Sequence, residues 1–382
     1  MPLLDGNEKA YLKECLDTNW VSSAGPFIEK FEAALAAETG LAHAAATVNG
    51  TAALHLALLV AGVEPEDEVL VSDLTFIAPA NAVTYVGAEP VFVDADPHSW
   101  QMDTDLVAKF LRDVCDRRDG GLVNRATGRR VTAILPVHIL GHPVDMDPLM
   151  TLADEFGLAV IEDATESLGA TNRGKPVGSS GDISCYSFNG NKLLTSGGGG
   201  MIASDNADWI EQSRHLSTQA RSSSEEYIHD AVGFNYRLTN IQAALGLAQM
   251  ERIADHIAAK KAIAAAYQKA FAEVPGLSFM PEADGVESTF WLSTVLVDKA
   301  AFGMGSRDLQ AHLAELSIQT RPLWQPLHLS PPYAGSMFLG SGVADGLYVS
   351  ALSLPSSCGL TRDQQERVIA EVIAAQQSGP RR

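Results

Sequence analysis

The stretch DISCYSFNGNKLLTSGGGGM, residues 182–201, joins an apolar run to one lysine and four consecutive glycines. Its first seven residues do not alternate strictly between apolar and polar side chains, which predicts a strand buried on both faces. Lys192 follows that strand and is the sole charged residue between positions 187 and 201. In doubly wound α/β sheets, ligands bind beyond the carboxyl ends of the strands. Lys192 is therefore the first candidate for a functional residue.

Similar strand-like runs precede this stretch, and helical patterns such as 51–62 and 147–157 lie between them. Strands that alternate with helices are typical of a mostly parallel sheet with helices on both faces, so the sequence predicts an α/β fold. The five further runs are HAAATV (43–48), EVLVSD (68–73), PVFVDAD (90–96), VTAILPVHIL (131–140) and LAVIEDA (158–164).

The pattern changes after about residue 245. Residues 241–274 have the period of one long connecting helix, and a strand-like run follows at 288–298. Helical patterns come next at 307–316 and from Thr361 onward. We expect a large α/β domain over residues 1–245 and a smaller α+β domain over residues 246–382. The basic stretch 115–130 interrupts the first domain as a hairpin or loop, to which we assign no chemical role.

The composition excludes several classes of function. A formal net charge of −20 makes a nucleic acid or an anionic membrane an improbable partner. No run of about 18 apolar residues predicts a membrane span, and the acidic start does not resemble a signal peptide. Four scattered cysteines fit buried thiols of a cytoplasmic protein. His138 and His142 are four residues apart, but Gly141 and Pro143 break any helix there, so we expect no metal site.

Polar or small residues lie at the ends of several of the predicted strands. Asn49-Gly50-Thr51-Ala52 follows the first, Thr75-Phe76 the second, and Asn189 to Lys192 the last, while His138 comes after residues 131–137 of the fourth run. Asp163 lies at the end of the fifth run. Because the carboxyl ends of parallel strands lie at one edge of a sheet, these side chains should converge on one crevice.

These residue types suit pyridoxal 5′-phosphate (PLP). Gly50, Thr51 and Ala52 would offer N–H groups at a helix N-terminus to a phosphate, and Ser187 would add a hydroxyl. An aromatic side chain can stack on the flat ring, a carboxylate can pair with its protonated nitrogen, and a lysine amine can attack its aldehyde. Phe76, Asp163 and Lys192 have these three roles in the prediction.

Each of these residues also has a simpler interpretation. A lone lysine after a strand is usually solvated, Asp163 could cap the next helix, and Thr51 could merely cap its own. Phe76 could be a core residue, and Asn235 could lie in a turn. For His328 and Trp324 a surface loop and simple packing stay open. Only the combination of Lys192, Asp163 and NGTAAL favours the functional interpretation.

Taken together, seven motifs resemble the DegT/StrS-type sugar-nucleotide aminotransferases, which are fold-type I PLP enzymes. The resemblance covers nearly the whole chain and implies a mostly parallel, seven-stranded sheet flanked by helices. The motifs are NGTAAL (49–54), DLTFIAPANAV (73–83), PVHILGHPVDMDPL (136–149), IEDATESLGA (161–170), SFNGNK (187–192), GFNYRLTNIQAALG (233–246) and TRPLWQPLH (320–328).

The resemblance implies roles at the matching positions. Lys192 bonds covalently to PLP and moves protons, Asp163 meets the pyridine nitrogen, and Glu166 lies near the cofactor hydroxyl. Asn235 reaches the phosphate of the neighbouring subunit, which implies a homodimer with shared sites. The resemblance adds two groups, namely the phosphate-binding residues Gly50, Thr51, Ala52 and Ser187 and the sugar-nucleotide-binding residues Arg321, Trp324 and His328.

Within the family, SFNGNKLLTSGGGG and LDTNWVSSAG (16–25) look most like transaminases for bacillosamine- and legionaminic-type sugars. The implied reaction moves an amino group, from L-glutamate, to C4 of UDP-2-acetamido-2,6-dideoxy-4-keto-hexose through PLP and pyridoxamine phosphate. A GDP-perosamine synthase is the alternative. A PLP-dependent sugar dehydratase and a non-catalytic binding member are weaker alternatives, because Lys192 and Asp163 are both present.

Overall fold

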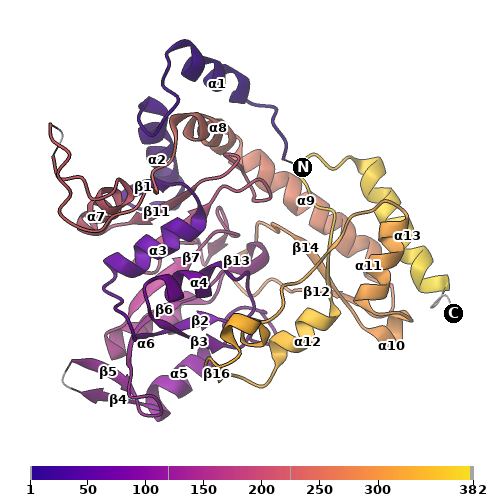
Figure 1. Ribbon diagram of the computed structural model, residues 1–382. Helices are drawn as coiled ribbons and strands as arrows, with labels where there is room; N and C mark the ends of the chain where they lie inside the picture. Colours follow the sequence, from indigo (N-terminus) through magenta and orange to yellow (C-terminus); the bar gives the residue numbers. More distant parts are fainter. Residues whose placement is uncertain (1, 119, 224, 379–382) are drawn as a thin grey trace.

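A sheet of ten strands forms the centre of the computed structural model, which describes residues 2–118, 120–223 and 225–378 (Figure 1). Eight strands follow one path in the order β1-β11-β10-β7-β6-β2-β3-β16, and β11 alone on this path runs antiparallel to its neighbours. The α/β fold predicted from the sequence is confirmed. The strands on the path are β1 (His43–Thr47), β2 (Glu68–Ser72), β3 (Glu89–Val93), β6 (Arg130–Leu135), β7 (Ala159–Asp163), β10 (Ile183–Ser187), β11 (Gly200–Ser204) and β16 (Phe338–Leu339).

Helices cover both faces of this sheet. Val69 and Val71 of β2 pack into one apolar cluster, while Leu70 between them packs into another on the opposite face. This alternation explains why the strands read as continuous apolar runs. The cluster of Val69 and Val71 includes residues of α3 (Gly50–Val60), α4 (Ala78–Tyr85) and α7 (Ala207–Ser217). The opposite face is covered by α2 (Pro26–Thr39), α5 (Thr104–Asp113), α6 (Met146–Phe156) and α8 (Asn240–Met250), with α1 (Glu8–Asp17) against α8.

A second, four-stranded antiparallel sheet lies in the C-terminal part, in the order β12-β14-β17-β15. Its apolar side chains form a separate core with α9, α11 and α13. The elements are α9 (Ile253–Phe271), β12 (Leu277–Phe279), β14 (Ser293–Val297), α10 (Lys299–Phe302), α11 (Ser306–Glu315), β15 (Arg321–Pro322), α12 (Val343–Ser350), β17 (Ala351–Leu354) and α13 (Arg362–Ser378). Smaller elements are β8 (Thr171–Asn172), β9 (Lys175–Pro176), β13 (Val286–Glu287) and the 3₁₀ turns η1 (Ile139–Gly141), η2 (Leu327–Leu329) and η3 (Pro331–Tyr333).

The strand count of seven was too low. Residues 338–339 of the C-terminal part return to pair with β3, a long-range contact that no local pattern announces. The helix predicted over 241–274 is divided at Glu251 and Arg252 into α8 and α9. The domain boundary at residue 245, which falls within α8, stays a prediction.

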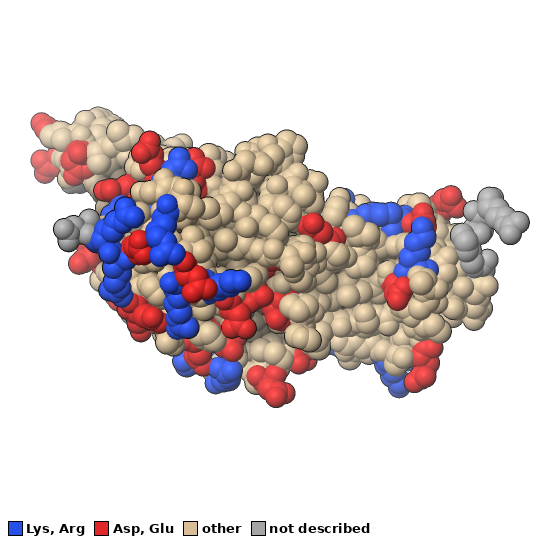
Figure 2. All heavy atoms as spheres, turned by 90° about the horizontal axis from the view of Figure 1, so that it is seen from below, with Lys and Arg blue, Asp and Glu red and all other residues tan. Residues whose placement is uncertain are grey.

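The basic stretch 115–130 forms a hairpin of β4 (Cys115–Arg118) and β5 (Gly121–Asn124) that joins the sheet at β6. Figure 2 shows lysine and arginine side chains gathered on this side of the molecule, with acidic side chains between them. Arg125 lies 3.0 Å from Asp116, and Arg130 lies 2.8 Å from Asp67. These arginines are therefore matched by carboxylates and do not form a uniformly positive surface.

No helix in the described ranges is long and apolar enough to cross a membrane. The same ranges contain no group of three or more His, Cys, Asp or Glu side chains arranged to hold a metal ion. The four cysteines are free thiols, and three of them are buried.

Candidate active site

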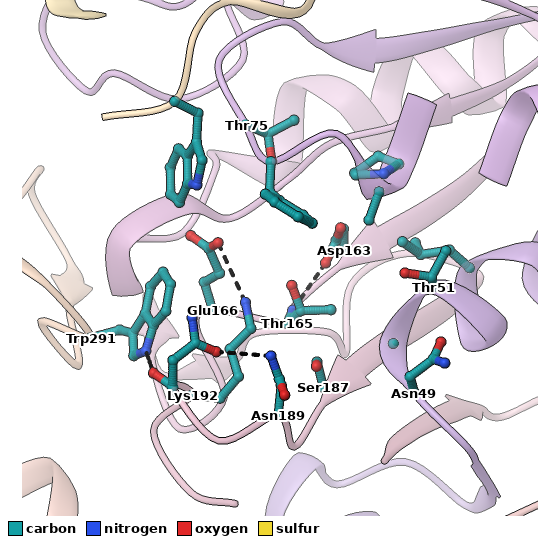
Figure 3. Close-up of a pocket in the computed structure, with 17 residues that line it drawn as sticks. Asn49, Thr51, Thr75, Asp163, Thr165, Glu166, Ser187, Asn189, Lys192 and Trp291 are labelled. Carbon is teal, nitrogen blue, oxygen red and sulfur yellow. Dashed lines mark hydrogen bonds and ion pairs between the residues drawn. The ribbon is translucent and has the colours of Figure 1, made fainter. Parts of the chain in front are cut away.

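A cavity of about 200 Å³ lies at the carboxyl ends of β1, β2, β7 and β10, where the sequence predicted it (Figure 3). Side chains from the large sheet and two tryptophans from the C-terminal part line it. The lining residues to which the sequence analysis gave a role are Gly50, Thr51, Phe76, Asp163, Glu166, Ser187, Lys192 and Trp324. Asn49, Thr75, Asn189 and Asn191 also line it, as their places after the strands predicted, whereas Thr165 and Trp291 were missed.

The N-terminus of α3 forms one wall. Asn49 is its N-cap, and its side chain accepts the N–H of Ala52 at 2.8 Å. That N–H is thus already bonded, and Ala52 does not line the cavity, whereas Gly50 and Thr51 do. Helix N-termini attract anions through free N–H groups and the helix dipole. The wall fits a phosphate group.

The glycines of the opening stretch permit a close approach at this wall. A Cβ on Gly200 would lie 2.4 Å from the carbonyl carbon of Asn49, and a Cβ on Gly50 would lie 2.8 Å from Cβ of Ser187. Both contacts are shorter than side chains tolerate, so glycine is required at both positions. β10, β11 and the start of α3 can therefore meet tightly behind the phosphate-binding wall.

Asp163 is the last residue of β7, and its carboxylate is buried at the floor of the cavity. Its Oδ1 accepts the N–H of Thr165 at 3.1 Å. Burial raises the pKa of this carboxyl group, although Thr165 and the charge of Lys192 act in the opposite direction. A protonated pyridine nitrogen would favour the ionised form, so Asp163 fits the ring of PLP.

Glu166 is a second buried carboxylate in the same cavity. Its Oε2 accepts the N–H of Leu140 at 3.0 Å, and its Oε1 lies 3.4 Å from Nζ of Lys192. Burial raises the pKa of Glu166, and the positive charge of Lys192 partly offsets that effect. Figure 3 shows Lys192 pointing toward Glu166, with Asp163 and Thr165 beside them.

Trp291 fixes the surroundings of Lys192. The Lys192 Nζ lies 4.5 Å from the centre of the Trp291 ring, which is a cation–π distance. The indole Nε1 donates to the carbonyl oxygen of Asn191 at 2.8 Å, so the ring also holds the lysine loop. Trp324 stacks on Trp291 with ring centres 6.4 Å apart. No motif in the sequence indicated Trp291 as a site residue, since it lies only within a strand-like run.

The chain matches one family model over nearly its whole length. The model described as the DegT/DnrJ/EryC1/StrS aminotransferase family matches residues 2–373. The chain belongs to this family. It is a sugar-nucleotide aminotransferase, and its cofactor is PLP, which alternates with pyridoxamine phosphate.

Individual relatives agree with this assignment. The GDP-perosamine synthase of Caulobacter vibrioides is 42% identical over 97% of this chain and 95% of its own length. The GDP-perosamine synthase of Escherichia coli O157:H7 is 38% identical over 95% and 94%. Among solved structures, Streptomyces venezuelae DesV in complex with a ketimine intermediate is 33% identical, with a TM-score of 0.85 over 97% of this chain and 94% of that one.

Besides Ala52, three residues predicted for the site of the aminotransferase do not line the cofactor cavity. His328 Nδ1 lies 2.7 Å from Oδ2 of Asp73, and its ring stacks on Phe338. Arg321 lines a neighbouring cavity instead. Asn235 is exposed in the segment before α8 and does not line the cofactor cavity of its own chain. Their roles in binding stay predictions.

The two histidines of the 136–149 motif serve the packing of the aminotransferase. His138 is fully buried behind β7, where its Nε2 lies 2.9 Å from Glu162 and its Nδ1 accepts the N–H of Val144. His142 Nδ1 lies 3.1 Å from Oγ of Ser288. The sequence analysis placed His138 among the side chains that converge on the crevice, but the structure buries it in the packing behind β7, outside the cofactor cavity.

Proposed function

We propose that this aminotransferase transfers the amino group of L-glutamate to C4 of a GDP-linked 4-keto-6-deoxy sugar. The proposed GDP-linked acceptor is supported by the 42% identity, over nearly the whole chain, to a protein named GDP-perosamine synthase. Two more relatives, at 38% and 36%, have the same name. The UDP-linked acceptor expected from the motifs is therefore not favoured.

The roles of the side chains follow from their positions in the cavity. PLP, when bound, supplies an electron-withdrawing ring that stabilises negative charge on the substrate carbon. Asp163 would keep the ring nitrogen protonated, and Gly50, Thr51 and Ser187 would hold the phosphate. Lys192 would accept a proton from the donor carbon and return one to C4 of the acceptor.

The pairing of Lys192 with Glu166 supports this proton transfer. The carboxylate lies 3.4 Å from Nζ and keeps the amine oriented within the cavity. The face of Trp291 limits the positions that Nζ can reach, since it lies 4.5 Å away on another side. An amine held in this way is pre-positioned, which lowers the entropic cost of each transfer.

The proposal includes a homodimer with shared sites. Residues 218–223 and 225–239 belong to a segment that extends from the body of the chain near α7 (Figure 1). Tyr227 and Val232 on this segment are 86% and 87% exposed, and Phe76 at the cavity mouth is 56% exposed. Exposed apolar side chains of this kind favour contact with another protein surface. A second copy of this chain would cover them and bring Asn235 toward the phosphate site.

A substrate panel tests the acceptor. The holoenzyme is incubated with L-glutamate and the GDP-, UDP- or dTDP-linked 4-keto-6-deoxy sugar, and aminated products are identified by mass. We expect amination of the GDP-linked sugar at a kcat/KM at least about tenfold above the others, since one lost hydrogen bond costs that much. Turnover of the UDP-linked sugar alone would contradict the proposal and leave the reaction class unchanged.

A further inference from the structure

A second cavity, of about 350 Å³, lies on the other side of the lysine loop. It is bounded by Gly190–Leu193, by α9 and by residues 353–358. Asn191 and Lys192 line both this cavity and the cofactor cavity. A molecule bound in the second cavity would therefore lie directly beside the reacting lysine.

The second cavity has a basic lining in a chain of net charge −20. Four basic side chains line it, and no Asp or Glu is found among the described residues of its wall. Arg321, which the family resemblance assigned to substrate binding, is one of the four. The others are Lys192, His256 and Lys260.

His256 is buried in this wall without a hydrogen-bonding partner. Its side chain is 2% exposed, and neither ring nitrogen has a partner within the described part of the chain. A buried polar group left in this state costs about 1–3 kcal/mol, so such groups usually have a partner. A ligand in the cavity would provide one for the imidazole N–H.

Lys260 lies one turn further along α9 and is held in place by two carbonyl oxygens. Its ammonium donates to the carbonyl of Trp291 at 2.7 Å and to that of Ser356 at 2.6 Å. An ammonium has three N–H donors, so one is left for a ligand. Burial lowers the pKa of Lys260 to about 8, and a bound anion would favour its charged form.

We propose that this cavity binds a compact anionic group, a carboxylate or phosphate of one substrate, through His256, Lys260 and Arg321. Which substrate supplies the anion depends on the proposed function. The amino donor and its 2-oxo acid product carry carboxylates, and the sugar nucleotide carries a diphosphate. Because Lys260 also bonds the carbonyl of Trp291, whose ring packs on Lys192, the anion is held next to the residues that orient the lysine.

Calorimetric titration of the PLP-loaded enzyme tests the site without turnover. Glutarate, a dicarboxylate that lacks the reactive amine, represents the donor, and inorganic pyrophosphate represents the nucleotide. The variants are Arg321→Met, on an exposed side chain, and Lys260→Met, in the wall. Lys261→Met is the matched control, because this neighbouring lysine on α9 is exposed and pairs with Glu287 outside the cavity.

We expect one of the two anions to bind with a stoichiometry of one per chain. Its Kd should rise about tenfold in Arg321→Met and in Lys260→Met, and less than twofold in Lys261→Met, as expected for losing one charged hydrogen bond. Binding of glutarate alone assigns the site to the amino donor, and binding of pyrophosphate alone assigns it to the nucleotide.

No binding of either anion up to about 10 mM would overturn the proposal, as would a Kd that Arg321→Met leaves unchanged. Arg321→Met decides the matter if Lys260→Met does not fold. The two proposals can fail independently. If the substrate panel shows another acceptor, the proposed function is wrong, but the result of the titration still stands.

Discussion

Glu162 and Asp163 are neighbours on β7, but the protein surrounds their carboxylates with different numbers of hydrogen-bond donors. Successive side chains of a strand point to opposite faces, so Glu162 lies behind the sheet edge and Asp163 lies in the cofactor cavity. Glu162 is bonded to His138 and accepts the N–H groups of Gly178, Ser180 and Gly181. Asp163 accepts one N–H, from Thr165.

The pKa values of the two groups move in opposite directions. Burial acts to raise the pKa of Glu162, but the bond to His138 and the backbone N–H groups outweigh it, and the result is a lowered value. Burial raises the pKa of Asp163, and the hydrogen bonds from the hydroxyl and the N–H of Thr165 and the charge of Lys192 offset this effect only in part. A buried carboxylate satisfied by its own chain therefore has a structural role, whereas one left short of partners is suited to a ligand.

Among the changes to the cofactor cavity, we expect Lys192→Ala to have the largest effect. We expect the rate of 2-oxo acid release from glutamate to fall at least about 10³-fold, because the nucleophile and the proton carrier are both lost. The yellow absorbance band of the PLP-loaded protein should also shift. Lys192→Arg keeps the charge and should be equally inactive, and activity within tenfold of the wild type in either variant would refute the role.

Asp163→Asn should lower the catalytic rate and leave the stability of the protein nearly unchanged. We expect kcat to fall about 10²-fold, since the ring nitrogen loses its charged partner. The free energy of unfolding of the cofactor-free protein should change by less than about 1 kcal/mol, because the lost bond from Thr165 is offset by removing a buried charge that is costly to desolvate. Steady-state kinetics and urea unfolding measure the two effects. A large loss of stability with little loss of kcat would show that Asp163 has a structural role instead of a catalytic one.

Glu162→Gln should give the opposite result. Losing the charged hydrogen bond to His138 should lower the free energy of unfolding by about 2 kcal/mol. The kcat of the folded variant should stay within about tenfold of the wild type, since Glu162 does not line the cavity. Asp163→Asn is the matched control, one residue along the strand.

The pH dependence of stability sharpens this test. A carboxyl group whose pKa is lowered by folding stabilises the protein above its unfolded pKa, ordinarily 4.5 for Glu, and that contribution is lost as the pH falls through the folded value. The difference in Tm between wild type and Glu162→Gln should therefore shrink below pH 4.5. A difference that stays constant down to complete protonation would argue against an ionised Glu162.

Asn235→Ala is the smallest expected effect and tests the shared site. We expect the Kd for PLP to rise about tenfold, because one hydrogen bond to a phosphate is lost across the subunit contact. Equilibrium dialysis measures cofactor retention, and light scattering measures the mass. A wild-type monomer at working concentration, or unchanged retention in the variant, would speak against a site completed by a second copy.

Local sequence predicted most of the cavity for a physical reason. Strand-like runs followed by Gly50, Asp163, Ser187 and Lys192 are local patterns, and a parallel sheet brings the ends of such strands together. Trp291 could not be predicted in this way, because it bonds to the lysine loop across 100 residues of sequence. The same holds for β16, whose pairing with β3 depends on how the C-terminal part folds back.

The sequence by itself determined the α/β class, the cofactor and the residues at the strand ends, because these follow from hydrophobic periodicity and local motifs. Only the tertiary structure decided how many hydrogen-bond donors surround Glu162 and Asp163. It also brought His256, Lys260 and Arg321 together around a second cavity. Burial and the supply of hydrogen-bond donors depend on contacts between distant segments, and those contacts set the difference between Glu162 and Asp163.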